Sequence, residues 1–186
     1  MNAYRLNLLM CLCVCIFNLG AQSLYNSQFK EEPMLHPDFL VAGDTVAIVA
    51  PAGILINKTQ QIENAKALMQ SWGLNVLSAP HLFSKANHFA GSDEERTADM
   101  QWALDHPKVK AIWCARGGYG VTRIIDDLDF TLFLNKPKWL IGYSDITVLH
   151  AHLNRLRVAS IHGMMGVNLD RESTDLDVSK ATLKWF

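Results

Sequence analysis

The sequence has no excess of charge of either sign. Its 186 residues include 17 lysines and arginines and 18 aspartates and glutamates, which gives a formal net charge of −1. Proteins held to nucleic acids or anionic membranes by general electrostatic attraction carry a clear basic excess. The composition therefore gives no reason to expect nucleic acid or an anionic membrane as a partner, and a small molecule or a peptide fits better.

Cysteine is scarce as well. Three of the four cysteines, at positions 11, 13 and 15, fall in an apolar run near the N-terminus, and the fourth is Cys114. A chain from which this run has been removed keeps a single thiol, so an intrachain disulfide is excluded there. Cys114 lies in a second apolar run, residues 110–115, where a lone thiol is far more often a packing residue than a nucleophile.

The N-terminal apolar run is also short for a membrane span. Arg5 is followed by the apolar residues 6–17 and then by a polar segment, whereas a transmembrane helix needs about 20 apolar residues. This is the layout of a signal peptide over residues 1–21, with cleavage near Gly20 or Ala21. We expect export, to the periplasm, and no stable membrane span after cleavage. An uncleaved anchor and a lipoprotein are the alternatives.

No internal repeat or low-complexity linker divides the rest of the sequence. From residue 40 onward, short β-branched runs alternate with amphipathic segments, which is typical of βαβ units. The runs are almost continuously apolar, and this indicates a parallel sheet covered on both faces. We predict an α/β fold with a doubly wound, mostly parallel sheet whose strands occupy residues 45–50, 74–79, 109–115, 138–143 and 157–163.

The segments between these runs predict helices. Residues 58–73 place an apolar stripe on one face and end at Gly73, a natural residue just beyond a helix C-terminus. Residues 92–107 begin at Ser92 with Glu95 three positions later, which is the pattern of a capping box. Shorter helices are expected over residues 120–129 and 145–156.

These elements predict one domain over residues 40–167. The polar residues 168–180 are expected to leave it as a linker, and the remaining residues to 186 to begin a C-terminal domain that is essentially absent from the chain. We therefore expect the chain to be the N-terminal portion of a longer protein.

Unusual residues follow four of the predicted strands. They are PAG (51–53), RGGYG (116–120), GYSD (142–145) and HGMMG (162–166). Because open α/β sheets bind their ligands at the carboxyl ends of the strands, we expect these four segments to lie along one functional edge of the sheet.

GYSD lies directly between a predicted strand and a predicted helix, the context of a nucleophile elbow. Such a turn holds its serine in a strained conformation with the hydroxyl exposed. The motif departs from G-x-S-x-G, because Asp145 and Ile146 follow Ser144. A side-chain cap of the next helix by Ser144 or Asp145 explains the same pattern equally well, so the residues alone leave both interpretations open.

The RGGYG loop can turn the amides of Gly117 and Gly118 toward a ligand, as phosphate loops and oxyanion holes require. It lacks the lysine-threonine pair of a P-loop and the spacing of a dinucleotide motif, so nucleotide binding is only weakly indicated. A tight strand-to-helix turn is the simpler interpretation of this loop by itself.

No metal site is indicated. Four of the seven histidines, at positions 36, 81, 88 and 106, lie in expected loops with no cysteine or carboxylate at ligand spacing, and the pair at 150 and 152 points to different sides of a helix. The aspartates within residues 126–129 are expected to form a solvated helix end. A surface or supporting role is expected for all of the histidines: His36, His81, His88, His106, His150, His152 and His162.

Taken together, these motifs resemble the LD-carboxypeptidases, also called muramoyltetrapeptide carboxypeptidases, which have the microcin-immunity peptidases as relatives. The resemblance covers about residues 40–168. Its segments are GDTVAIVAPAG (43–53), FAGSDEERTADMQWALDHPKVKAIWCARGGYG (89–120), KWLIGYSDIT (138–147) and IHGMMG (161–166).

The resemblance implies a flavodoxin-like N-terminal domain and a serine peptidase with a Ser-His-Glu triad. Such an enzyme releases the terminal D-alanine from peptidoglycan tetrapeptides during cell-wall recycling and needs no metal or organic cofactor. The resemblance makes Ser144 the nucleophile and the backbone amides of Gly118 and Asp145 the oxyanion hole. The triad histidine and glutamate belong to the family's C-terminal domain, so no residue of this chain is assigned to them, His162 included.

Two alternatives accompany this expectation. The first is a microcin-immunity type of peptidase, which cleaves a toxic peptidyl or aminoacyl nucleotide with the same nucleophile. The second is a catalytically inert remnant, because a serine without its histidine base loses most of its activity. The resemblance also allows a homodimer.

Overall fold

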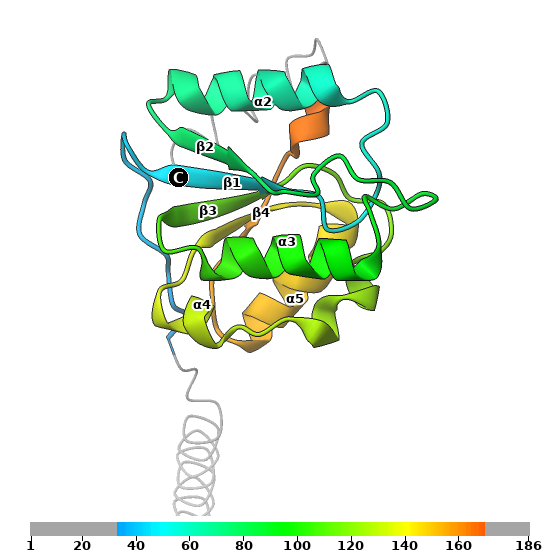
Figure 1. Ribbon diagram of the computed structural model, residues 1–186. Helices are drawn as coiled ribbons and strands as arrows, with labels where there is room; N and C mark the ends of the chain where they lie inside the picture. Colours follow the sequence, from blue (N-terminus) through cyan, green and yellow to red (C-terminus); the bar gives the residue numbers. More distant parts are fainter. Residues whose placement is uncertain (1–32, 170–186) are drawn as a thin grey trace, which may run out of the picture. The chain divides into compact units, whose positions relative to one another are not determined.

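The computed structural model describes residues 33–169. Within these residues, five strands form one parallel sheet in the order β2-β1-β3-β4-β5 (Figure 1). This is the strand order of a flavodoxin-like, doubly wound sheet, so the predicted fold class is confirmed. The strands are β1 (Thr45–Val49), β2 (Asn75–Ser78), β3 (Val109–Cys114), β4 (Trp139–Gly142) and β5 (Ile161–His162).

Helices connect these strands. The α-helices are α2 (Thr59–Ser71), α3 (Asp93–Asp105), α4 (Thr131–Asn135) and α5 (Thr147–Arg155). Short 3₁₀ turns are η1 (Val121–Arg123), η2 (Ile125–Asp127), η3 (Ser144–Ile146) and η4 (Gly166–Asn168). The predicted signal peptide, residues 1–21, lies outside the described residues, and so does the predicted linker beyond Leu169. The domain boundaries at residues 40 and 167 stay predictions.

The helices cover both faces of the sheet. Helix α2 lies on one side, and α3, α4 and α5 lie on the other (Figure 1). In the interior strand β1, Val46 and Ile48 pack on the α2 side, whereas Ala47 and Val49 pack on the α3 side, and all four are fully buried. Because successive side chains of a strand point to opposite faces, a sheet covered on both sides needs apolar residues at every position. This explains the continuous apolar runs of the sequence.

Two of the predicted helix ends are confirmed. The hydroxyl of Ser92 accepts a hydrogen bond from the Glu95 N–H at 3.2 Å, and the Glu95 carboxylate accepts one from the Ser92 N–H at 2.8 Å. Helix α2 is followed by Gly73, which has a φ of +81° and donates its N–H to the Gln70 carbonyl. Glycine adopts this left-handed conformation at little cost.

The helix predicted over residues 120–129 is wrong. The structure has η1 and η2 there, followed by α4, which the sequence pattern did not predict. Three exposed aspartates would stand at the C-terminal end of such a helix, where the helix dipole disfavours negative charge. One of them, Asp129, instead accepts a hydrogen bond from the Thr131 N–H at the start of α4.

The last strand is shorter than the predicted residues 157–163. Arg157 has a φ of +60°, which bends the chain before β5 begins. The residues on either side of Val158 pair with Leu35, because the Leu35 N–H donates to the Arg157 carbonyl and the Ala159 N–H donates to the Leu35 carbonyl. The N-terminal segment therefore occupies backbone groups that the sequence pattern assigned to the sheet.

Cys114 is fully buried in the core on the α3 side of the sheet. Burial raises the pKa of its thiol far above the ordinary value, because a thiolate has no solvation there. The expected packing role of Cys114 is confirmed.

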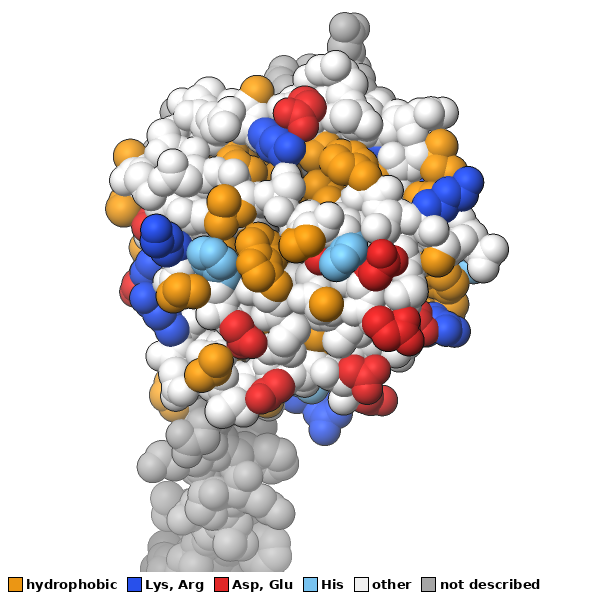
Figure 2. Space-filling view, viewed as in Figure 1, with side chains coloured by type: hydrophobic (Ala, Val, Ile, Leu, Met, Phe, Trp, Pro, Cys, Tyr) orange, Lys and Arg blue, Asp and Glu red, His pale blue; other side chains and the backbone are white. Residues whose placement is uncertain are grey.

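The described surface carries charged side chains of both signs and hydrophobic side chains. On the face drawn in Figure 2, acidic and basic side chains both occur, and hydrophobic side chains lie among them. Within residues 33–169, no helix is long and apolar enough to cross a membrane.

Lys138 is a buried cation directly before β4, with 3% of its surface exposed. Its ammonium donates to the carbonyls of Ala103, Leu104 and His106 at 2.9, 2.6 and 2.8 Å, respectively. The last carbonyls of a helix have no partner within the helix, and this side chain supplies one for the end of α3. Burial lowers the pKa of Lys138 to about 8, so the ammonium is still the main form at pH 7.

Lys138→Met is expected to lower the free energy of unfolding by about 2–4 kcal/mol, because it leaves buried carbonyls at the end of α3 without donors. Urea unfolding of the 186-residue chain at pH 7, followed by circular dichroism, measures the change. Lys108→Met, at an exposed position nearby, is the matched control and is expected to have little effect. Equal urea midpoints for the two variants would contradict the capping role.

Candidate active site

The four segments predicted to follow the strands do lie together. The Gly53 N–H after β1 donates to the Gly117 carbonyl after β3 at 3.0 Å, and the Gly163 N–H after β5 donates to the Gly142 carbonyl at the end of β4 at 3.0 Å. Farther along, the Val167 N–H donates to the Ala115 carbonyl at 3.1 Å. These bonds join the carboxyl ends of the strands into one continuous edge, as predicted.

Ser144 lies at the turn between β4 and the helical residues that follow. Its φ is +64°, in the left-handed region, and its side chain belongs to an exposed residue. A residue with a Cβ is strained there by about 1–2 kcal/mol. The backbone thus has the strain expected of a nucleophile elbow.

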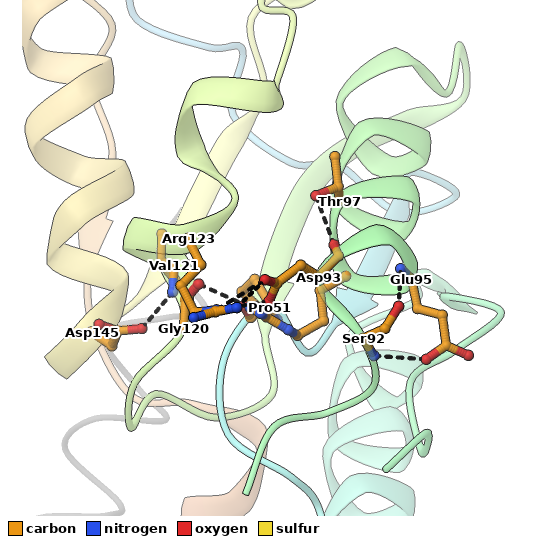
Figure 3. Close-up of polar contacts among 10 residues, drawn as sticks. Pro51, Ser92, Asp93, Glu95, Thr97, Gly120, Val121, Arg123 and Asp145 are labelled. Carbon is orange, nitrogen blue, oxygen red and sulfur yellow. Dashed lines mark hydrogen bonds and ion pairs between the residues drawn. The ribbon is translucent and has the colours of Figure 1, made fainter. Parts of the chain in front are cut away.

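The capping interpretation of GYSD is wrong for both residues. Neither η3 nor α5 has a side-chain cap. The Asp145 carboxylate points to a different segment and accepts a hydrogen bond from the Val121 N–H at 2.9 Å (Figure 3). This bond fastens the end of the RGGYG loop to the turn that holds Ser144.

Gly117 faces Ser144 directly. A Cβ added at Gly117 would lie 2.9 Å from the Ser144 Cβ and 3.1 Å from its Oγ. Side chains do not approach that closely, so only glycine permits this contact between the two loops. The adjacent Gly118 has a φ of +112°, a second position in the loop that favours glycine.

The amides predicted to form the oxyanion hole belong to these two loops. Within residues 33–169, neither the Gly118 N–H nor the Asp145 N–H donates a hydrogen bond to another residue. Two such donors on the loops that meet at Ser144 are what an oxyanion hole requires. Their role stays a prediction.

Arg96 was missed by the sequence interpretation, although it organises this edge. It is 1% exposed, and its Nη1 donates to the carbonyls of Pro51 at 2.6 Å and Gly120 at 2.9 Å. Asp93 makes ion pairs with both Arg96 and Arg123, and Figure 3 shows Asp93 beside Pro51 and Gly120. The hydrogen bond from Arg123 holds the pKa of the Asp93 carboxyl below its usual range.

A signal for Arg96 was present in the sequence. It lies four residues before Met100 and seven before Ala103, two apolar residues of the same helix, so helical spacing places it on the buried face of α3. The same spacing does not show which carbonyls a buried guanidinium would meet.

Within residues 33–169, no histidine makes a hydrogen bond to Ser144. His150 Nε2 donates to the Gly142 carbonyl at 2.9 Å, and its Nδ1 accepts from the Ser160 hydroxyl at 2.8 Å. Burial lowers the pKa of His150, and the nearby His162 lowers it further. His150 therefore supports the end of β4, which agrees with the supporting role that the sequence predicted.

Metal ligands do not cluster in the described part of the chain. Among residues 33–169, no group of three or more histidine, cysteine, aspartate or glutamate side chains is placed to hold a metal ion.

An open hollow of about 500 Å³ lies beside Ser144. Asn168 fixes part of its wall, because its amide donates to the Tyr143 hydroxyl at 3.1 Å and accepts from the Met165 N–H at 2.9 Å. The sequence pattern gave no signal for Lys58 or Asn168, which reach the hollow from segments outside the motifs. The lining residues are Lys58, Arg116, Gly117, Gly118, Tyr143, Ser144, Met165, Val167 and Asn168.

A strained, exposed serine between a parallel strand and a helix, opposite a glycine loop, is the arrangement of a nucleophile elbow in an α/β hydrolytic enzyme. The sequence model of the LD-carboxypeptidase N-terminal domain matches residues 46–163. The chain therefore belongs to the LD-carboxypeptidase family.

Known proteins agree with this membership. A murein tetrapeptide carboxypeptidase of Pseudomonas aeruginosa is 34% identical over 125 residues, which are 67% of this chain and 40% of that protein. The crystal structure of a muramoyltetrapeptide carboxypeptidase from Oxalobacter formigenes matches with a TM-score of 0.63 and 30% identity, over 74% of this chain and 47% of that one.

A more distant similarity concerns the fold alone. The structure of MccF in complex with glutamyl sulfamoyl guanosine matches with a TM-score of 0.74 at 18% identity, over 82% of this chain and 46% of that one.

The chain spans less than half the length of the curated relatives that it matches. The matches cover 40–45% of the relatives from Streptomyces coelicolor, Synechocystis, Bacillus subtilis and Pseudomonas aeruginosa.

Asp145→Ala is expected to free the Val121 N–H and to speed its hydrogen exchange about 10- to 100-fold, the usual effect of losing a bond to a carboxylate. Asp145→Asn is the matched control, because its amide oxygen can still accept from Val121. Exchange measured by NMR on the 186-residue chain tests this. Unchanged protection in Asp145→Ala would show that the bond does not hold the loop.

The lowered pKa of His150 predicts a pH effect on stability. As the pH falls through 6.5, the ordinary pKa of histidine, the unfolded chain takes up a proton at this residue before the folded chain does. Acidification therefore favours unfolding, and the free energy of unfolding should fall between pH 7.5 and pH 5.5. The slope of this free energy against pH should be smaller in His150→Gln than in the wild type, as measured by urea unfolding at several pH values. Equal slopes in wild type and His150→Gln would contradict the assignment.

Proposed function

We propose that this chain carries the nucleophile of a serine-type LD-carboxypeptidase that releases the terminal D-alanine from peptidoglycan tetrapeptides in cell-wall recycling. The observation that supports it most is the strained, exposed Ser144 packed against Gly117, within the segment that matches the family. The relatives named as murein tetrapeptide carboxypeptidases supply the substrate class.

In this mechanism the Ser144 hydroxyl attacks the carbonyl of the bond that precedes the terminal D-alanine, while a histidine base accepts the hydroxyl proton. The N–H groups of Gly118 and Asp145 stabilise the oxyanion of the tetrahedral intermediate, at about 3 kcal/mol for each donor. The histidine then gives its proton to the leaving amine, and water hydrolyses the acyl-enzyme.

The base comes from outside the described residues in this proposal. His150 has both ring nitrogens engaged with Gly142 and Ser160, so it is not placed to serve Ser144. We assign the histidine and the glutamate of the triad to a protein of the relatives' length that contains this chain, called here the full-length protein. The 186 residues alone are then expected to be nearly inactive.

The substrate could instead be an aminoacyl nucleotide, as in the microcin-immunity alternative. Two observations support this alternative substrate. The fold is similar to that of MccF, and two basic side chains line the hollow. A panel with a muropeptide tetrapeptide and an amide-linked aminoacyl nucleotide separates the two. The ratio of their kcat/KM values decides which substrate class the enzyme serves.

We further propose that the full-length protein is exported through the signal peptide at residues 1–21. N-terminal sequencing of the protein recovered from its native compartment tests this, with a mature N-terminus near residue 21 as the expected result. An intact Met1 would contradict cleavage. Light scattering on the same preparation measures whether it forms the expected homodimer.

Ser144→Ala is expected to lower kcat/KM for D-alanine release from a tetrapeptide by about 10⁴-fold or more in the full-length protein, because the acyl-enzyme can no longer form. Ser71→Ala, at an exposed position in α2, is the matched control and should leave the rate unchanged. Chromatographic measurement of free D-alanine follows the reaction. Comparable release by the Ser144→Ala variant would remove Ser144 from the mechanism.

A further inference from the structure

The hollow beside Ser144 is lined by two cationic side chains and by no acidic one. Lys58 reaches it from the residue before α2, and Arg116 from the loop after β3. The carboxylate of Asp145, which directly follows Ser144 in the sequence, does not line the hollow and accepts a hydrogen bond from the Val121 N–H. The described wall therefore presents positive charge to whatever binds next to the nucleophile.

Arg116 is held in place by the strand end beside it. Its Nη1 donates to the Ile54 carbonyl at 2.5 Å, and its Nε passes close to Gly53, where an added Cβ would lie 3.4 Å away. A guanidinium has five N–H donors in a fixed plane. The bond to Ile54 uses one of them, so the guanidinium of Arg116 is anchored and still has N–H donors for a ligand.

Position and charge fit one part of a carboxypeptidase substrate. Arg116 directly precedes Gly117, whose backbone touches Ser144. In a peptide that is cut before its last residue, the free carboxylate is separated from the scissile carbonyl carbon by the amide nitrogen and one Cα, about 4 Å away. A cation in the same hollow as the nucleophile is therefore within reach of that carboxylate.

We propose that Arg116 binds the free α-carboxylate of the terminal D-amino acid and thereby restricts cleavage to the last residue of the peptide. This rests on the proposed carboxypeptidase function. Charge-assisted hydrogen bonds from a guanidinium to a carboxylate are directional, so the same contact selects the substrate and positions its scissile bond.

The experiment compares two tetrapeptides, one with a free C-terminal carboxylate and one with a C-terminal carboxamide. In the full-length wild type, kcat/KM is expected to favour the free carboxylate. Arg116→Met should lower kcat/KM for this substrate about 10- to 100-fold, as expected for lost bonds to a charged group, and leave the carboxamide nearly unaffected. Arg116→Lys should keep part of the preference. Arg155→Met, exposed on α5, is the matched control.

Two catalytic outcomes would overturn the assignment. An equal loss for both substrates in Arg116→Met would show that Arg116 only supports the loop through Ile54. An unchanged preference for the free carboxylate would show that another group recognises it. Thermal unfolding of each variant confirms that the comparison is made on folded protein.

A binding measurement keeps this test separate from the proposed function. Calorimetry on the full-length Ser144→Ala variant, with the same two peptides and adenosine monophosphate, needs no turnover. A carboxylate preference that disappears when Arg116→Met is added supports the inference even if the wild type cleaves neither peptide. Arg116-dependent binding of adenosine monophosphate without a carboxylate preference would assign the site to phosphate and overturn the proposal.

Discussion

The buried guanidinium of Arg96 is the contact on which the arrangement of this edge depends. A charged group with 1% of its surface exposed must find its hydrogen bonds inside the protein. It finds them at the carbonyls of Pro51 and Gly120, which lie in the loops after β1 and β3. A Cβ at Gly120 would lie 2.7 Å from the Arg96 Nη1, so this position needs glycine as well. One side chain from α3 thus fixes the spacing of two loops.

Ser144 depends on a second set of contacts, which hold its strained turn from several sides. Gly142 carries no side chain, and a Cβ there would lie 2.9 Å from the Ile146 side chain. The Gly142 carbonyl accepts from both His150 and the Gly163 N–H. Strained backbone persists only where its surroundings over-determine it, and here the surroundings are β5, α5 and the glycine loop. The position of Ser144 is therefore a property of the whole edge and not of the GYSD motif alone.

The sequence predicted those features that depend on local chemistry. Ser92 and Glu95 lie within one helical turn, and the apolar runs of the strands need no knowledge of their partners. The contacts that the sequence did not predict join residues that are far apart in the chain. Leu35 takes up the backbone of residues 157–159 across more than a hundred positions, and hydrophobic pattern alone cannot show that such a pairing outcompetes β5. The turn that begins at Val121 is likewise held by a distant residue, Asp145, which lies in η3 after β4.

In the proposed mechanism, the charge of the hollow links substrate binding to catalysis. A histidine that takes the proton of Ser144 becomes cationic, and its charge develops beside the hollow that contains Arg116, where like charges repel. A bound carboxylate from the substrate offsets the positive charge of Arg116 before the proton moves. In the proposed assignment, the terminal carboxylate therefore has two effects. It positions the scissile bond of the peptide, and it makes the histidine a stronger base. A carboxamide supplies neither effect, so the preference for free carboxylate should appear in kcat as well as in KM.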